Sequence, residues 1–442
     1  MRIPSMKLLP AVLGFALAAA CGQASALGLL EAYDLALKND PAFRSAVYAN
    51  EAGKENRILG RSNLLPNVSA NYGSNKAHTV SDYGLGRVND QHYISRSTVV
   101  QVRQPLVNFD AIARYRQGVA QSNYTAAQFE SQEQNVILRV AEAYFDALFQ
   151  ADQVALARAE RDVYVEQRNV NDKLFKNGEG TRTDMLETQS RLDVAEAALI
   201  EAENNMNSAL DVLAGIIGGY VDRLDQLRPG FRAEQRDVLG FDAWKDIALR
   251  NNPDIQTLQY GVQVATEEIR KQRAGHLPRL DAIATYNKGV SDTTTTINQD
   301  IKTHSVGFQV NIPLYAGGAI SAATRQAAAN KGRAVADLET QINKVLVELR
   351  RQYKLTESSV PRINALIKAV DSAELLVKAT EQSIKGGVRI NLDVLNAQRQ
   401  LSLARRDLAQ ARYGYMLAQL RLKAAAGTLA RDDVQLIAAY FE

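Results

Sequence analysis

Residues 176–189 read KNGEGTRTDMLETQ, and residues 385–398, much later in the chain, read KGGVRINLDVLNAQ. The two stretches share residues at a constant separation of 209 positions, namely Gly178 and Gly387, Asp184 and Asp393, Leu186 and Leu395, and Gln189 and Gln398. In both stretches glycines lie between two segments with helical spacing. The chain is therefore predicted to be a tandem repeat in which each half carries a helix-turn-helix tip.

The duplication extends well beyond the tips. Residues 36–41 (ALKNDP) recur as residues 248–253 (ALRNNP), Leu65-Pro66 recurs as Leu277-Pro278, and residues 101–106 (QVRQPL) recur as residues 309–314 (QVNIPL). The separation drifts between 208 and 212 positions, which indicates short insertions and deletions in loops. A period of about 210 residues is too long for a solenoid and fits a duplicated unit of domain size.

The first 26 residues have the layout of a secretory signal peptide. Two basic residues precede an apolar run over residues 8–20, and Ala24-Ser25-Ala26 resembles a cleavage site. We expect the mature chain to begin near Leu27. A buried helix and a lipoprotein cleavage before Cys21 are the alternatives, and the second is disfavoured because Ala18 stands where such sites usually have Leu. Cleavage after Ala26 would leave no cysteine and hence no disulfide.

Composition excludes several classes of function. The 442 residues include 52 Lys and Arg against 49 Asp and Glu, a balance that offers no support for nucleic-acid binding. The single Trp, the ten Pro and the abundant Ala, Gln, Arg and Glu favour long helices. After the signal there is no run of 18 apolar residues, so the sequence excludes a membrane-spanning helix in the mature chain.

Four short segments alternate in a way that predicts β-strands, at residues 67–74, 98–106, 281–288 and 305–314. The last is the clearest, because Val306, Phe308, Val310, Ile312 and Leu314 alternate with polar or small residues. Such alternation places one face against lipid or core and the other against water. We expect two hairpins, at 67–107 and 281–315, with loops at 78–93 and 289–303. A small soluble sheet is the alternative.

The remaining chain has helical spacing. Two long helices are expected at 110–176 and 318–385, the second kinked by Pro361. Shorter helices are expected before the hairpins, at 30–63 and 241–275, and after the tips, at 183–215 and 391–426. The two post-tip helices carry heptad seams in equivalent register, Leu192, Leu199, Met206 and Leu213 in one and Leu401, Leu408, Tyr415 and Leu422 in the other.

These elements divide the chain into five parts. A signal peptide at 1–26 is followed by a first repeat at 27–217 with its tip turn at 177–183. A linker at 218–240 leads to a second repeat at 241–427, whose tip turn lies at 386–391, and a short tail spans 428–442. The predicted fold class is mainly α with a small β part, built by internal tandem duplication.

Catalysis finds little support in the sequence. The four histidines, His78, His92, His276 and His304, lie at hairpins or helix ends without paired ligand spacing, and phosphate loops, nucleophile elbows and zinc patterns are absent. We expect no enzyme activity, no cofactor and no bound metal, so that function depends on shape. Four strands cannot close a membrane barrel, because the smallest known have eight, so two or more chains must contribute.

The chain resembles the TolC-like outer-membrane efflux protein family over residues 27–436. The resemblance rests on the duplication, on Pro66 and Pro278 before the strands, on the QPL and IPL sequences after them, on residues 387–395 at the second tip, and on Gly427-Thr428-Leu429. It implies a homotrimer whose twelve strands form one outer-membrane barrel, continued by a long periplasmic barrel of coiled-coil helices.

Within that family the chain is most similar to the ducts of type I protein secretion. This similarity implies an inner-membrane ABC transporter and a periplasmic adaptor protein as partners, a secreted protein as cargo, and contact with outer-membrane lipid, without nucleic acid. A multidrug or small-molecule efflux channel is the alternative within the family. A helical scaffold without a pore is the alternative from another class.

The tip residues have two readings. From the residues alone, Thr181 and Asp184 form a capping box, and Asp393 lies in the first turn of a helix, where the helix dipole favours a carboxylate. The resemblance implies instead a periplasmic gate in which Arg389 bonds to Thr183 and Asp184 of a neighbouring helix pair.

The resemblance also implies an acidic ring in the lumen at Asp393. Asn396 occupies the second acidic position of that ring, and Ile384 stands where an aromatic residue often lies. Gly178, Gly386 and Gly387 are expected to form the tip turns.

Overall fold

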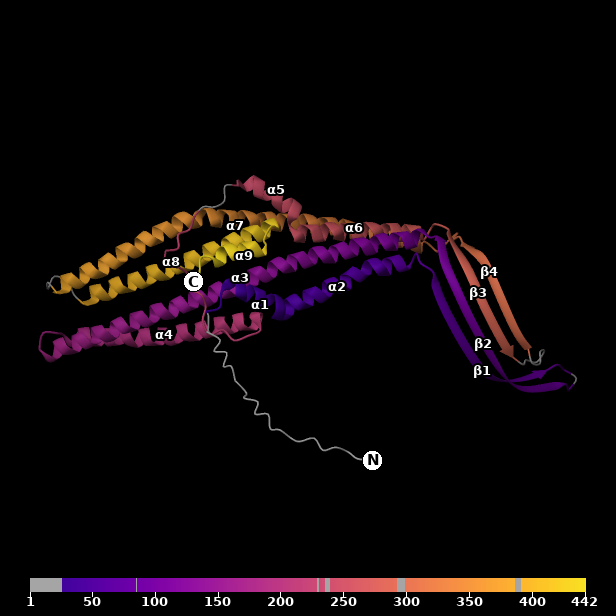
Figure 1. Cartoon of the computed structure of the whole chain (residues 1–442), viewed down its shortest axis with the longest axis horizontal. Coiled ribbons are helices and arrows are strands. Elements are labelled where there is room, and N and C mark those ends of the chain that lie inside the picture. The colour runs from indigo at the N-terminus through magenta and orange to yellow at the C-terminus, as the bar shows by residue number, and fades with distance from the viewer. Residues whose placement is uncertain (1–25, 85, 229, 235–238, 292–298, 386–390) are drawn as a thin grey trace, which may run out of the picture.

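The structure is a computed structural model that describes residues 26–84, 86–228, 230–234, 239–291, 299–385 and 391–442. The predicted signal peptide with Cys21 lies outside these residues, apart from Ala26. The chain is elongated, with the strands at one end and the helical tips at the other (Figure 1). The described part of the chain begins midway along the molecule, close to the C-terminus. Among the helices that are described, none combines the length and apolarity needed to cross a membrane.

Two long helices form the framework of the molecule. α3 (Phe109–Lys176) has 68 residues and α7 (Ala319–Lys385) has 67, so each is on the order of 100 Å long at 1.5 Å per residue. α2 (Pro41–Ser62) and α4 (Arg182–Ile217) pack along successive halves of α3, and α6 (Pro253–Ala274) and α8 (Asn391–Ala426) do the same along α7 (Figure 1). α7 continues through Pro361 without interruption.

The helices before the hairpins are each divided in two, so the prediction of single helices at 30–63 and 241–275 was wrong. α1 (Leu29–Asn39) is separated from α2 by Asp40, and α5 (Phe241–Asn251) is separated from α6 by Asn252. Both residues precede a proline, which disfavours the helical conformation, and their ψ angles are 116° and 121°. Their side chains then cap the next helix, Asp40 by accepting from the Ala42 amide at 2.9 Å.

The four strands form one antiparallel sheet in the order β1-β2-β3-β4. Their bounds are Asn67–Asp82 for β1, Val88–Val107 for β2, Arg279–Ser291 for β3 and Gln299–Asn311 for β4. The predicted loops at 78–93 and 289–303 were therefore too long, since the ladder continues beyond the apolar alternation that marked the strands. β4 ends before Pro313, whose nitrogen has no hydrogen to donate to a ladder.

The central pair of strands joins the two repeats. β2 pairs with β3 from Arg96 opposite Val290 to Val107 opposite Leu280. An ion pair between Arg103 and Asp281 crosses this seam, and the Asp281 side chain is only 2% exposed. β1 and β4 each have a neighbour on one side only, so the sheet has two open edges.

The main core lies at the middle of the molecule. Tyr144 and Phe145 of α3 are buried there and pack against Phe441, with ring centroids 5.9 Å apart in both cases. The linker and the C-terminal segment close this core through two isolated β-bridges, Leu27 with Leu224 and Leu227 with Phe441. α9 (Arg431–Ala438) covers it, so the predicted tail contains a short helix that periodicity had not indicated.

Candidate functional site at the helical tips

The first tip is a tight turn between α3 and α4. The amides of Glu179 and Gly180 both donate to the carbonyl of Leu174, at 2.9 and 3.1 Å, which closes the end of α3. Gly178 has a φ of +81°, in the left-handed region where a side chain would be strained. The backbone at this position therefore favours glycine over residues with a side chain.

Thr181 is the N-cap of α4, although the reciprocal bond of the predicted capping box, from the Thr181 amide to the Asp184 carboxylate, is not among the described contacts. Thr181 accepts from the Asp184 amide at 3.1 Å, and its hydroxyl donates to the Asp184 carboxylate at 2.5 Å. The helix already begins at Arg182, so Thr183 belongs to its first turn and is exposed, whereas the predicted turn extended to residue 183. Within one chain, Asp184 thus serves the helix end, with a carboxylate where the helix dipole is positive.

The predicted gate is not assembled in the described part of the chain. Arg389 lies outside the described residues, as do Gly386 and Gly387, while Thr183 and Asp184 are both placed at the start of α4. The bond between Arg389 and this pair stays a prediction. Its two acceptors are adjacent residues in the first turn of α4, and the start of α4 lies at the end of the molecule opposite the strands (Figure 1).

The predicted acidic ring falls on the first turns of α8. Asp393 is half-buried and Asn396 is exposed, while Val394 and Leu395 between them are buried. Leu395 is fully buried in a cluster with Tyr164 of α3 and Leu192 of α4. This packing fixes the rotation of α8, so residues 393 and 396 cannot turn toward the core of the chain.

Sequence reasoning missed a buried polar contact beneath the first tip. The amide of Asn171 donates to the Thr188 hydroxyl at 2.8 Å, and that hydroxyl donates to the Asp184 carbonyl at 2.9 Å. The corresponding positions in the second repeat, 209 residues later, hold Thr380 and Ala397. This difference between the repeats is a sequence signal that could have pointed to the contact.

Comparison with known proteins identifies the family. The family model for "Outer membrane efflux protein" matches residues 32–219 and 244–428, which correspond to the two repeats. The chain is 41% identical to the alkaline protease secretion protein AprF of Pseudomonas aeruginosa, covering 95% of this chain and 88% of AprF. It is 37% identical to the proteases secretion protein PrtF of Dickeya chrysanthemi, covering 95% of this chain and 92% of PrtF.

A solved structure agrees on the fold. The Campylobacter jejuni CmeC outer membrane channel superposes with a TM-score of 0.80, covering 93% of this chain and 89% of that one, at 17% sequence identity. The fold and the tandem tips define an outer-membrane channel subunit of the export class. The chain belongs to the outer membrane efflux protein family, and the predicted resemblance is confirmed.

Family membership settles the location and the general role. The chain is an outer-membrane export protein, with the sheet as its membrane part and the long helices in the periplasm. The description of the family is that of a transport protein.

Proposed function

We propose that three copies of this chain form the exit duct of a type I protein secretion system. In this assembly the duct receives a secreted protein from an inner-membrane ABC transporter and a periplasmic adaptor protein. We infer a protein cargo from sequence identity. Over 95% of its length the chain is 41% and 37% identical to two proteins named for protease secretion.

The sheet supports an assembly of several chains. Its edge strands β1 and β4 leave rows of backbone groups without partners on one side, which no membrane protein tolerates within lipid. Three copies supply twelve strands, whereas two would give eight, a barrel already filled by its own side chains. We therefore expect β1 of one chain to pair with β4 of the next.

One face of the sheet fits contact with lipid. Val306 and Phe308 of β4 are 87% and 75% exposed in the single chain, and Val68 and Tyr72 of β1 are 63% and 70% exposed. The register places Val306 opposite Ala284 and Phe308 opposite Ala282, so the apolar side chains share one face across β3 and β4. An apolar outward face is what a transmembrane barrel requires.

Cross-linking tests the trimer. A variant with one cysteine on β1 and one on β4, at facing edge positions, should give disulfide-linked trimers in oxidised outer membranes. Each single-cysteine variant is the matched control, because neither can link more than two chains. Linked dimers without trimers, or an absence of linked species from every facing pair, would contradict the assembly.

Deletion of the gene tests the cargo. Loss of one or a few proteins from the culture medium, restored by the intact gene, is the result expected of a type I duct. Unchanged secretion together with increased drug sensitivity would show small-molecule efflux instead. Normal secretion and normal drug sensitivity, with the protein absent from outer membranes, would indicate a scaffold without a pore.

A further inference from the structure

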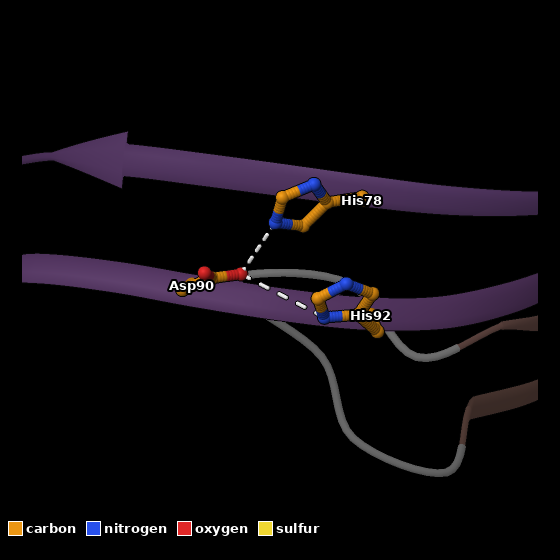
Figure 2. Close-up of side chains that lie close together, drawn as sticks. All are labelled: His78, Asp90 and His92. Atoms are coloured by element: carbon orange, nitrogen blue, oxygen red, sulfur yellow. Dashed lines mark hydrogen bonds and ion pairs between the residues drawn. The ribbon is translucent and has the colours of Figure 1, made fainter.

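The outer half of the first hairpin brings together three side chains with metal-binding atoms. His78 of β1 lies directly opposite His92 of β2 in the ladder, and Asp90 lies two residues from His92 on the same strand face. Figure 2 shows both rings turned toward the Asp90 carboxylate. Nε2 of His78 is 2.7 Å from Oδ1 of Asp90, and Nδ1 of His92 is 3.7 Å from the same oxygen.

We propose that His78, Asp90 and His92 form a binding site for a divalent transition-metal ion such as Zn²⁺ or Ni²⁺. Two imidazole nitrogens with one carboxylate are ligands that these ions prefer, whereas Mg²⁺ and Ca²⁺ favour oxygen ligands only. The three donor atoms lie within 4.8 Å of one another. Bonds of about 2.0–2.1 Å at tetrahedral angles separate ligand atoms by roughly 3.3 Å, so small movements would enclose an ion.

The required movements are available to these side chains. The two rings are stacked, with centroids 4.0 Å apart and planes 15° apart, and they must tilt for both nitrogens to point at one ion. All three side chains are exposed, His78 by 51%, Asp90 by 57% and His92 by 64%, so rotation meets little resistance. Water would complete the coordination, because three protein ligands leave at least one position open.

The ladder also determines which side of the sheet carries this site. Alternate residues share a strand face, so His78 lies on the same face as Val68 and Tyr72, which are the exposed apolar residues of β1. His78 lies six positions beyond Tyr72, which is roughly 20 Å along the strand. Pairing between neighbouring strands places one residue of each strand in a row across the sheet. The row that contains Tyr72 consists of Tyr72, Thr98, Lys288 and Lys302.

That row places the site beyond the membrane. Two lysines in one row indicate that the apolar band of this face ends there, since charged side chains are disfavoured against lipid. His78, Asp90 and His92 therefore lie past the lipid, on the outward face of the hairpin and away from the lumen. This placement rests on the proposed barrel, whereas the ligand set itself does not.

Metal titration tests the site. Purified full-length protein in detergent, freed of metal with a chelator, should bind one ZnCl₂ or NiCl₂ equivalent per chain in isothermal titration calorimetry. His78→Ala, His92→Ala and Asp90→Asn should each weaken binding by at least about tenfold. His304→Ala is the matched control, because His304 lies on β4 beside Tyr286, and it should bind as the wild type does.

A second measurement does not depend on calorimetry. An ion that joins β1 to β2 should slow proteolysis at the connection between them, residues 83–87, in the wild type and the His304→Ala variant but not in the three ligand variants. Equal affinity and equal proteolysis in the His78→Ala and wild-type proteins would overturn the proposal. So would the absence of binding in wild-type protein that is shown to be folded by its circular dichroism spectrum.

Discussion

The hydroxyl of Tyr413 in α8 donates a hydrogen bond of 2.9 Å to the carboxylate of Asp152 in α3. The contact joins the two repeats near the middle of the molecule, where Tyr413 stacks on Phe145 with ring centroids 6.2 Å apart. Burial raises the pKa of the Asp152 carboxyl, against the opposing effects of this hydrogen bond and of Arg412. Burial also raises the pKa of the Tyr413 hydroxyl, and the negative charge of Asp152 adds to it.

The raised pKa of Asp152 predicts how stability depends on pH. The folded protein holds this proton to higher pH than the unfolded chain, so the free energy of unfolding should fall as pH rises from about 3.8, the ordinary value, through the pKa in the folded state. Asp152→Asn removes the titration and should flatten that part of the profile. Thermal melts in detergent, followed by circular dichroism, measure it, and identical profiles would contradict the assignment.

Gly118 allows α2 and α3 to pack closely where they cross, so we predict that a larger residue there destabilises the protein. A methyl group there would overlap the carbonyl oxygen of Asn56 and approach the Gly60 Cα at 3.3 Å. We expect Gly118→Ala to destabilise the protein by about 1–3 kcal/mol, as overpacked cores do. Gly332 in α7 is the matched control, because nothing lies within 4 Å of its added methyl group, and Gly332→Ala should stabilise by about 0.5–1 kcal/mol. Equal melting temperatures for the two variants would refute this account.

The gate prediction concerns Arg389, Thr183 and Asp184. If the guanidinium bonds to the neighbouring pair, Arg389→Ser removes charge-assisted bonds that a serine cannot replace. Single-channel conductance in a planar bilayer should rise in Arg389→Ser. Asp184→Ala should also raise it, although this variant also loses the first-turn carboxylate that accepts from Thr181, so Thr181→Ala, which removes the helix cap, serves as the control. Unchanged conductance in both Arg389→Ser and Asp184→Ala would leave the Asp184 carboxylate with only its contact to Thr181 in the first turn of α4.

The acidic-ring prediction concerns Asp393. Three copies around one axis would concentrate cations and favour multivalent ions, so trivalent cations should block the channel from the periplasmic side. Asp393→Asn should abolish the block without changing trimer assembly, and Asn396→Asp should strengthen it. An Asp393→Asn channel that is blocked as well as the wild type would place the ring elsewhere.

Local signals in the sequence predicted the helical framework well. Heptad spacing marked α4 and α8, the glycine at 178 marked the first tip, and the alternation after residue 305 marked β4. The breaks at Asp40 and Asn252 were also encoded locally, by the prolines that follow them, yet helical periodicity continued across both sites and concealed them. Strand length was underestimated because only the apolar part of each strand alternates clearly.

Long-range contacts were beyond the reach of the sequence. His78 and His92 are 14 positions apart, and nothing in that spacing shows that the hairpin register places them opposite one another. Arg139 pairs with Asp40, and Arg103 with Asp281, through packing between elements far apart in the chain. Such pairs depend on how helices and strands meet, which composition and periodicity do not specify.

The pairing of β2 with β3 has a consequence for how the protein is made. Residues 108–278 lie between the two strands, so the whole first tip hairpin and the linker must be synthesised before the seam can form. Contacts that close such long loops form slowly. Strand edges that stay unpaired during this time promote aggregation. Until β3 has been made, the edge of β2 that pairs with it therefore stays open, and anything that shields this edge would favour correct assembly.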